Sequence, residues 1–182
     1  LYPEVRFPAF VEDAAAAVAW ARSHARDYGG DPARLYLVGH SAGAHIATLL
    51  ALDHRYLGAH GVRPAELAGV VGLSTPADFA ATLGARYRPV FGDDAGLAAA
   101  QPVRYVNPDA PPLLLIHGGE DSLVWPKNSE ALAERQRAAG GRVELALFPE
   151  LGHVGTVSPF TGWFGDPAVV EKVAGFLGLR PD

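Results

Sequence analysis

Short apolar runs alternate along this chain with longer segments in which apolar residues recur at a helical period. The runs have the length and the aliphatic composition of buried strands, and they cover residues 35–38, 67–73, 113–116 and 143–148. Helices are expected around them, at residues 8–28, 42–52, 126–139 and 167–177. Strands that alternate with helices of this length predict right-handed crossovers, and hence a parallel sheet covered by helices on both faces.

Glycine and proline residues punctuate this pattern. Pro8 suits the first turn of the first helix, and Gly29-Gly30 suits its end. The stretch 76–110 carries Pro and Gly throughout and separates the second predicted strand from the third. We expect one domain over residues 1–182, in which 76–110 is an insertion that shapes a substrate pocket.

A serine lies between two glycines where a predicted strand passes into a predicted helix, in the segment LVGHSAGAHIATLL at residues 37–50. The pattern is G-x-S-x-G, with the strand ending at Gly39 and the helix beginning by Ala42, as a nucleophile elbow requires. Ser41 would then occupy a sharp, strained turn, in which a side chain at position 39 or 43 would clash. The Ala42 N–H, at the helix N-terminus, would be an oxyanion-hole donor. The alternative is a glycine-rich turn with an incidental serine.

A serine nucleophile needs a base and a group that orients the base. Asp121 lies just past a predicted strand in LLLIHGGEDSLV, and His153 lies in the loop after the next strand, in FPELGHVGT. The carboxyl ends of parallel strands meet at one edge of a sheet, so both residues would lie at the edge that carries Ser41. The order Ser, acid, His is the one expected of an α/β-hydrolase. We therefore predict this triad, against the alternative of a turn carboxylate and an exposed loop histidine.

Two other carboxylates lie near the predicted acid in the fold. Glu120 is adjacent to Asp121, but its side chain should point the other way. Asp78 is the more serious rival, because it follows the preceding strand, from which some hydrolases take their acid. We place Asp121 ahead of both.

Four further side chains are candidates for substrate binding. His40 is the variable residue of the elbow and is expected to line the pocket. Tyr87, Phe91 and Trp125 could line an acyl or alcohol pocket, with ordinary packing as the alternative for each.

The other histidines have no predicted catalytic role. His45 lies four residues past the serine on the predicted helix and is expected to pack, and His117 is expected to occupy a turn after the third strand. The rest have no carboxylate or histidine partners at ligand spacing, so no metal site is predicted; they are His24, His54 and His60.

Composition narrows the class of protein. Of the 182 residues, 49% are hydrophobic and 19% charged, as in an ordinary globular domain. The net charge of -5 argues against a nucleic-acid partner. The absence of Cys excludes disulfides and thiolate metal sites. Nothing in the chain resembles a signal peptide or a membrane span, so we expect a cytoplasmic protein that does not bind a membrane.

These residues carry a resemblance to a known family. The run LYPEVRFPAFVEDAAAAVAWARSHARDYGGDPARLYLVGHSAGAHIATLLALD resembles the esterase/lipase branch of the α/β-hydrolases. It is similar to small carboxylesterases, to acetyl- and feruloyl-esterase-like enzymes and to kynurenine formamidases. The match continues in order through VRYVNPDAPPLLLIHGGEDSLVWPKNSEALAERQRAAGG and FPELGHVG, and covers nearly the whole chain.

The resemblance implies a doubly wound, mostly parallel α/β-hydrolase sheet and the hydrolysis of small acyl esters without a cofactor. Ser41 would carry the acyl group, His153 would act as base and then as acid, and Asp121 would orient it. Two alternatives stay open: an arylformamidase acting on an N-formyl amide, and a catalytically silent hydrolase-like fold used for binding.

The chain departs from the family's pattern at its N-terminus. Such enzymes carry an HGGG-like motif upstream that supplies a second oxyanion donor, and nothing before residue 8 matches it. The chain also contains no Met and begins with LYPE, which looks like the tail of the strand that follows this motif. We therefore expect a partial fold that lacks about a third of the family's length. Its sheet would have an open edge, covered by the missing segment or by a second copy in a homo-oligomer.

Overall fold

A four-stranded parallel sheet forms the centre of the molecule in the computed structural model, which describes residues 2–162 and 164–179, with the side chains of 81–86 outside the described set. The strand order is β1-β2-β3-β4, and all neighbouring pairs are parallel. This confirms the predicted parallel α/β sheet. The strands are β1 (Tyr36–His40), β2 (Gly69–Leu73), β3 (Leu113–Gly118) and β4 (Val143–Phe148).

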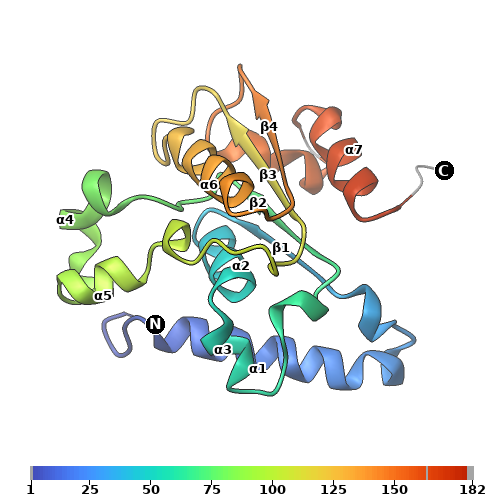
Figure 1. Cartoon of the computed structure of the whole chain (residues 1–182). Helices are drawn as coiled ribbons and strands as arrows, with labels where there is room; N and C mark the ends of the chain where they lie inside the picture. The colour runs from blue at the N-terminus through green and yellow to red at the C-terminus, as the bar shows by residue number, and fades with distance from the viewer. Residues whose placement is uncertain (1, 163, 180–182) are drawn as a thin grey trace.

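Helices cover both faces of the sheet, as predicted. One face packs against α2 (Ala42–Leu52) and α6 (Lys127–Ala138), with α1 (Ala9–His24) lying against α2. Of the α-helices in the described part of the chain, α7 (Pro167–Phe176) is the one that covers the opposite face, as Figure 1 shows. Alternate side chains of the inner strands therefore enter two different cores. Val70, Leu113 and Leu115 join the α2 side, whereas Val71, Leu114 and Ile116 join the α7 side.

The stretch 76–110 contains two helices that the sequence prediction did not place, α4 (Ala80–Phe91) and α5 (Asp94–Ala99). Both project to one side of the sheet in Figure 1. Pro89 lies inside α4, in its last turn, and a proline there argues against a helix in a reading of the sequence. A small separate core holds the stretch together, made of Phe79, Leu97 and Ala100.

Shorter elements complete the described chain. The first predicted helix ends earlier than expected, at His24, and continues as a 3-10 turn that Gly29 closes with a positive φ of 76°. The helix α3 (His54–Gly58) follows α2 directly. The 3-10 turns span Ala25–Tyr28, Pro32–Arg34, Pro64–Glu66, Pro102–Arg104, Val154–Thr156 and Ser158–Thr161.

The register of the strands brings three loops together. His40 pairs with Leu73, and Leu73 with Ile116, so the carboxyl ends of β1, β2 and β3 lie at one edge of the sheet. Gly118 pairs with Phe148 at the same end. The loops that follow β1, β3 and β4 therefore leave the sheet side by side, which is the placement that a site built from several loops requires.

The strand β1 lies at one side of the described sheet. Within the described residues it is hydrogen-bonded to β2 alone, and its residue Val38 is 51% exposed. In contrast, every residue of β2 and β3 is buried. Among the helices of residues 2–162 and 164–179, none has the length and apolar character that a membrane span needs.

Candidate active site

Ser41 occupies a strained turn between β1 and α2. Its backbone has a positive φ of 54° with ψ at -117°, a conformation that a residue with a side chain rarely adopts. The Ser41 N–H donates to the Leu73 carbonyl oxygen at 2.9 Å, which ties the turn to β2. Gly39 makes the turn possible, because a Cβ at this position would lie 2.4 Å from the backbone of Gly43.

The expectation that a side chain would also clash at position 43 is wrong. A Cβ on Gly43 would have no heavy atom within 4 Å outside its own helix. The reason is geometric: the first turn of α2 presses the backbone of Gly43 against the Cα of Gly39, while the open side of Gly43 faces outward. Close approach of the two segments therefore depends on one glycine of the motif and not on both.

The structure brings Ser41, His153 and Asp121 into one hydrogen-bonded line. His153 Nε2 lies 2.9 Å from Ser41 Oγ, and His153 Nδ1 lies 2.8 Å from Asp121 Oδ2. An ionised carboxylate can only accept, so Nδ1 carries the proton and Nε2 is free to accept from the serine hydroxyl. This is the tautomer that a histidine needs to act as the base of a serine nucleophile.

Asp121 is 3% exposed and is held by several donors. Its Oδ1 accepts from the Leu123 N–H at 3.0 Å and from the Val124 N–H at 2.8 Å. Burial opposes the charged form of this carboxyl group. Hydrogen bonds from the Val124 amide and from the His153 and Ser74 side chains outweigh burial and hold the pKa of Asp121 below its usual value. The residue is therefore an anion at neutral pH.

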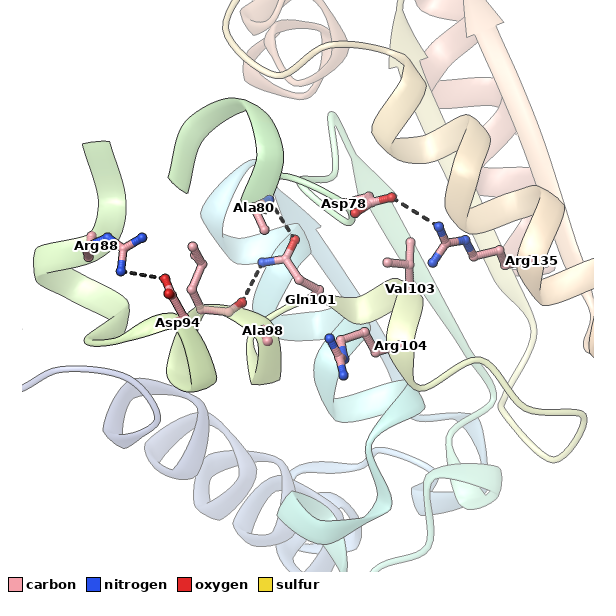
Figure 2. Close-up of a pocket in the computed structure, with 10 residues that line it drawn as sticks. Asp78, Ala80, Arg88, Asp94, Ala98, Gln101, Val103, Arg104 and Arg135 are labelled. Carbon is pink, nitrogen blue, oxygen red and sulfur yellow. Dashed lines mark hydrogen bonds and ion pairs between the residues drawn. The ribbon is translucent and has the colours of Figure 1, made fainter. Parts of the chain in front are cut away.

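Both rival carboxylates lie elsewhere. Figure 2 shows Asp78 turned toward Arg135, whose guanidinium lies 3.5 Å away, at the wall of a cavity of about 470 Å³ on the α4 and α5 side. Glu120 is exposed to solvent. The hydrogen bond to His153 is made by Asp121.

The backbone of His153 is fixed by side chains from other elements. His40 Nε2 donates to the His153 carbonyl oxygen at 2.9 Å, and the two imidazole rings lie 4.7 Å apart. Thr156 Oγ1 donates to the same oxygen at 3.1 Å, and Ser74 Oγ contacts Thr156 Oγ1 at 3.0 Å. Desolvation by burial lowers the pKa of His40, which favours the neutral ring. Ser74 and Thr156 were not predicted from the sequence, because hydroxyl residues in loops follow no recurring pattern.

His117 differs from its sequence interpretation. It was expected in a turn, but it lies within β3 and its side chain is fully buried. The strand runs two residues past its predicted end at 116, because Gly118 still pairs with Phe148 of β4. His117 Nε2 lies 3.3 Å from Asp121 Oδ2, so a second histidine contacts the carboxylate.

An apolar cavity of about 420 Å³ opens beside Ser41 and Ala42. Of the residues that the structure describes, its lining includes Tyr87 and Phe91 but neither His40 nor Trp125, the latter being half exposed beneath Lys127. The other lining residues are Tyr2, Phe10, His45, Ile46, Pro76, Phe79, Val90, Leu123 and Val124. Among the described residues that line the cavity there is no Asp, Glu, Lys or Arg, so it suits an apolar group of a substrate.

His45 forms part of the cavity wall from the first turns of α2. It is buried, and its Nε2 donates to the Ala100 carbonyl oxygen at 2.6 Å. Phe79 and Phe91 present their rings to it at 5.5 and 5.7 Å. Desolvation by burial lowers the pKa of His45 to about 4, so the ring is neutral near pH 7.

The chain is similar to curated esterases. It is 31% identical over 200 residues to Esterase LipQ of Mycobacterium tuberculosis (strain ATCC 25618 / H37Rv), an alignment that covers 97% of this chain and 45% of LipQ. It is 30% identical over 182 residues to Esterase LipC of the same strain, covering 83% of this chain and 42% of LipC. The chain thus spans less than half the length of these relatives.

Solved structures share the fold. The propionate-bound esterase Est2 of Thermogutta terrifontis superposes with a TM-score of 0.80 at 24% identity, over 100% of this chain and 70% of that one. An acetyl ester-xyloside bifunctional hydrolase from Caldicellulosiruptor lactoaceticus gives 0.78 at 23% identity, over 98% and 70%. The profile of the BD-FAE family matches residues 1–136, which is most of the chain. The chain therefore belongs to the BD-FAE family of α/β-hydrolases.

Proposed function

We propose that this chain hydrolyses small carboxylic esters through a covalent acyl-enzyme on Ser41. The observation that supports this most directly is the line from Ser41 Oγ through both ring nitrogens of His153 to Asp121 Oδ2, with distances of 2.9 and 2.8 Å. Nucleophile, base and orienting acid have the mutual geometry that acyl transfer needs. The named esterases among the relatives support the same reaction class.

The reaction proceeds in two steps. Ser41 Oγ attacks the carbonyl carbon of the ester while its proton passes to His153 Nε2, and the imidazolium is stabilised by Asp121. His153 then returns that proton to the leaving alkoxide as the bond between the carbonyl carbon and the alcohol oxygen breaks. Water repeats the sequence on the acyl-enzyme: it loses a proton to His153, attacks the acyl carbon, and releases the acid as Ser41 Oγ regains the proton.

Two features around Ser41 would receive the substrate. The negative charge that develops on the carbonyl oxygen faces the N–H of Ala42, the first residue of α2, which has no acceptor within its own helix. An apolar acyl or alcohol group would enter the cavity whose wall includes Phe79 and Phe91. The second oxyanion donor expected from an HGG-type motif stays a prediction.

Labelling with a fluorophosphonate tests the nucleophile in the full-length protein. The wild type is expected to take one label and to turn over p-nitrophenyl acetate. Ser41→Ala should lose the label and at least about 10⁴-fold of kcat. Ser23→Ala changes an exposed serine of α1 and should behave as the wild type. Full turnover by Ser41→Ala would refute the proposal.

The same preparation separates the two alternatives. An arylformamidase would hydrolyse N-formylkynurenine faster than p-nitrophenyl acetate, with Ser41 still required. A catalytically silent binding protein would take no label and turn over neither compound. The ester hydrolase proposed here takes the label and prefers the ester.

A further inference from the structure

We propose that His117 is a positioning residue of the active site, which holds the Asp121 carboxylate through the same oxygen that accepts from His153. This inference rests on the proposed function, because it assigns a role to His117, which contacts Asp121 of the proposed triad. His117 does not reach Ser41 or the cavity; it acts through Asp121.

The contacts of His117 use both of its ring nitrogens. Nε2 lies 2.8 Å from the Val124 carbonyl oxygen and 3.3 Å from Asp121 Oδ2, and Nδ1 lies 2.6 Å from Ser129 Oγ. The side chains of His117 and Asp121 are both fully buried. The ring therefore connects the carboxylate to β3, through its own backbone, and to α6, through Ser129.

These partners determine the tautomer. A carbonyl oxygen can only accept, so the Val124 contact requires a proton on Nε2. Nδ1 is then the acceptor, and the Ser129 hydroxyl donates to it. Desolvation by burial lowers the pKa of His117, in favour of the neutral ring. The residue thus presents a fixed N–H dipole to Asp121 and not a second positive charge.

The geometry of the carboxylate explains why this donor matters. Asp121 Oδ1 is occupied by the amides of Leu123 and Val124, so Oδ2 is left for His153. His117 Nε2 donates to the Val124 carbonyl oxygen and also lies 3.3 Å from Oδ2, so the N–H dipole stands beside the carboxylate. This contact limits rotation of the carboxylate, and the N–H dipole partly offsets the negative charge that Asp121 presents to His153. Of the other described titratable rings, His40 also lies near this cluster, with its ring 4.7 Å from that of His153.

Substitutions at His117 test the inference in the full-length protein. His117→Leu removes the donor, whereas a Gln side chain can place an amide N–H near the position of Nε2. We expect His117→Leu to lower kcat about tenfold with KM within about twofold, since a polar N–H beside a buried charge is lost. We also expect the acid limb of the kcat/KM profile to move to higher pH, because the carboxylate without this dipole stabilises the imidazolium more strongly. His117→Gln should restore most of both quantities.

A packing defect alone would give a different result. Leu132→Ala creates a cavity in α6, the helix that carries Ser129, at a fully buried residue in the core that α6 shares with the sheet. It should lower stability to urea and leave the acid limb in place. The inference is overturned if His117→Leu leaves the limb unmoved and loses no more kcat than Leu132→Ala.

A measurement on the unsubstituted protein covers the case in which His117→Leu does not fold. Nitrogen-15 shifts of the imidazole groups should assign His117 as a neutral ring protonated on Nε2 at neutral pH. A proton on Nδ1, or a charged ring at neutral pH, would refute the inference. Failure of the proposed function is separate, since it would appear as full turnover by Ser41→Ala.

Discussion

The two halves of the candidate active site are held in place by different means. At the elbow, the backbone of Ser41 is strained, and Gly39 lets β1 and α2 approach so closely that a single Cβ would be 2.4 Å from the backbone of the facing turn. At the loops after β3 and β4, Asp121 and His153 are held by hydrogen bonds from amides, a hydroxyl and the imidazole ring of His40.

This difference predicts two kinds of sensitivity. The geometry of the elbow depends on the volume of its side chains, because closely packed backbone segments cannot move apart to accommodate an added atom. The geometry of the loops depends on hydrogen-bond donors, because a buried anion that loses its hydrogen bonds raises the free energy of the folded state. The Asp121 carboxylate would then shift, and His153 with it. Substitutions that add a methyl group should therefore damage the elbow, and substitutions that remove a charge or a donor should damage the loops.

In the comparison of the elbow with the loops, the largest effect is expected from Asp121→Asn. The amide cannot hold His153 in the Nδ1–H tautomer, so kcat should fall by about 10⁴-fold while the fold is kept. Steady-state kinetics on p-nitrophenyl acetate measures this. Asp78→Asn is the matched control, because it removes an acid whose partner is Arg135, and it should stay within about twofold of the wild type. The reverse outcome would move the acid to Asp78.

A pair of glycine substitutions tests the volume argument at the elbow. Gly39→Ala should cost about 3 kcal/mol or more of the free energy of unfolding, since the new methyl group meets backbone atoms that cannot move aside. Gly43→Ala should stabilise by about 0.5 kcal/mol, because alanine favours the first turn of α2 and open space surrounds it. Urea denaturation measures both. Equal losses at the two positions would contradict the asymmetry.

Low pH is expected to destabilise the fold around α2, the helix that follows Ser41, because His45 in this helix is held neutral in the folded chain. The pKa of this residue is lowered from 6.5 to about 4 in the folded chain, so the unfolded chain binds the additional proton between these values. The stability contributed by the neutral ring is present above pH 6.5 and is lost as the pH falls, by up to about 3 kcal/mol.

Denaturation by urea at pH 7 and pH 4 checks this prediction. His45→Gln retains a donor for the Ala100 carbonyl oxygen and cannot titrate, so it should lose less stability on acidification than the wild type. His60→Gln changes an exposed histidine and should follow the wild type. An identical acid response in all three proteins would show that His45 does not titrate as proposed.

Much of the fold followed from local pattern. The strand at 143–148 and the helix at 42–52 have the bounds that the sequence predicted, because both are mainly apolar segments between turn residues. The helices α4 and α5 were not predicted. Pro89 argues against a helix in the sequence of α4, and α5 is too short to show a helical period. The end of β3 also escaped, because it depends on pairing with β4.

By itself, the sequence indicated the chemical types at the site: a serine between glycines, an acid after one strand and a histidine after the next. These signals are local, because strand ends and turns have compositions that the chain displays directly. Only the tertiary structure decided which carboxylate is hydrogen-bonded to the histidine and which glycine is sterically required. It also brought His117 into contact with Asp121. Those facts depend on distances between segments far apart in the chain, and such distances are set by the packing of the strands and helices.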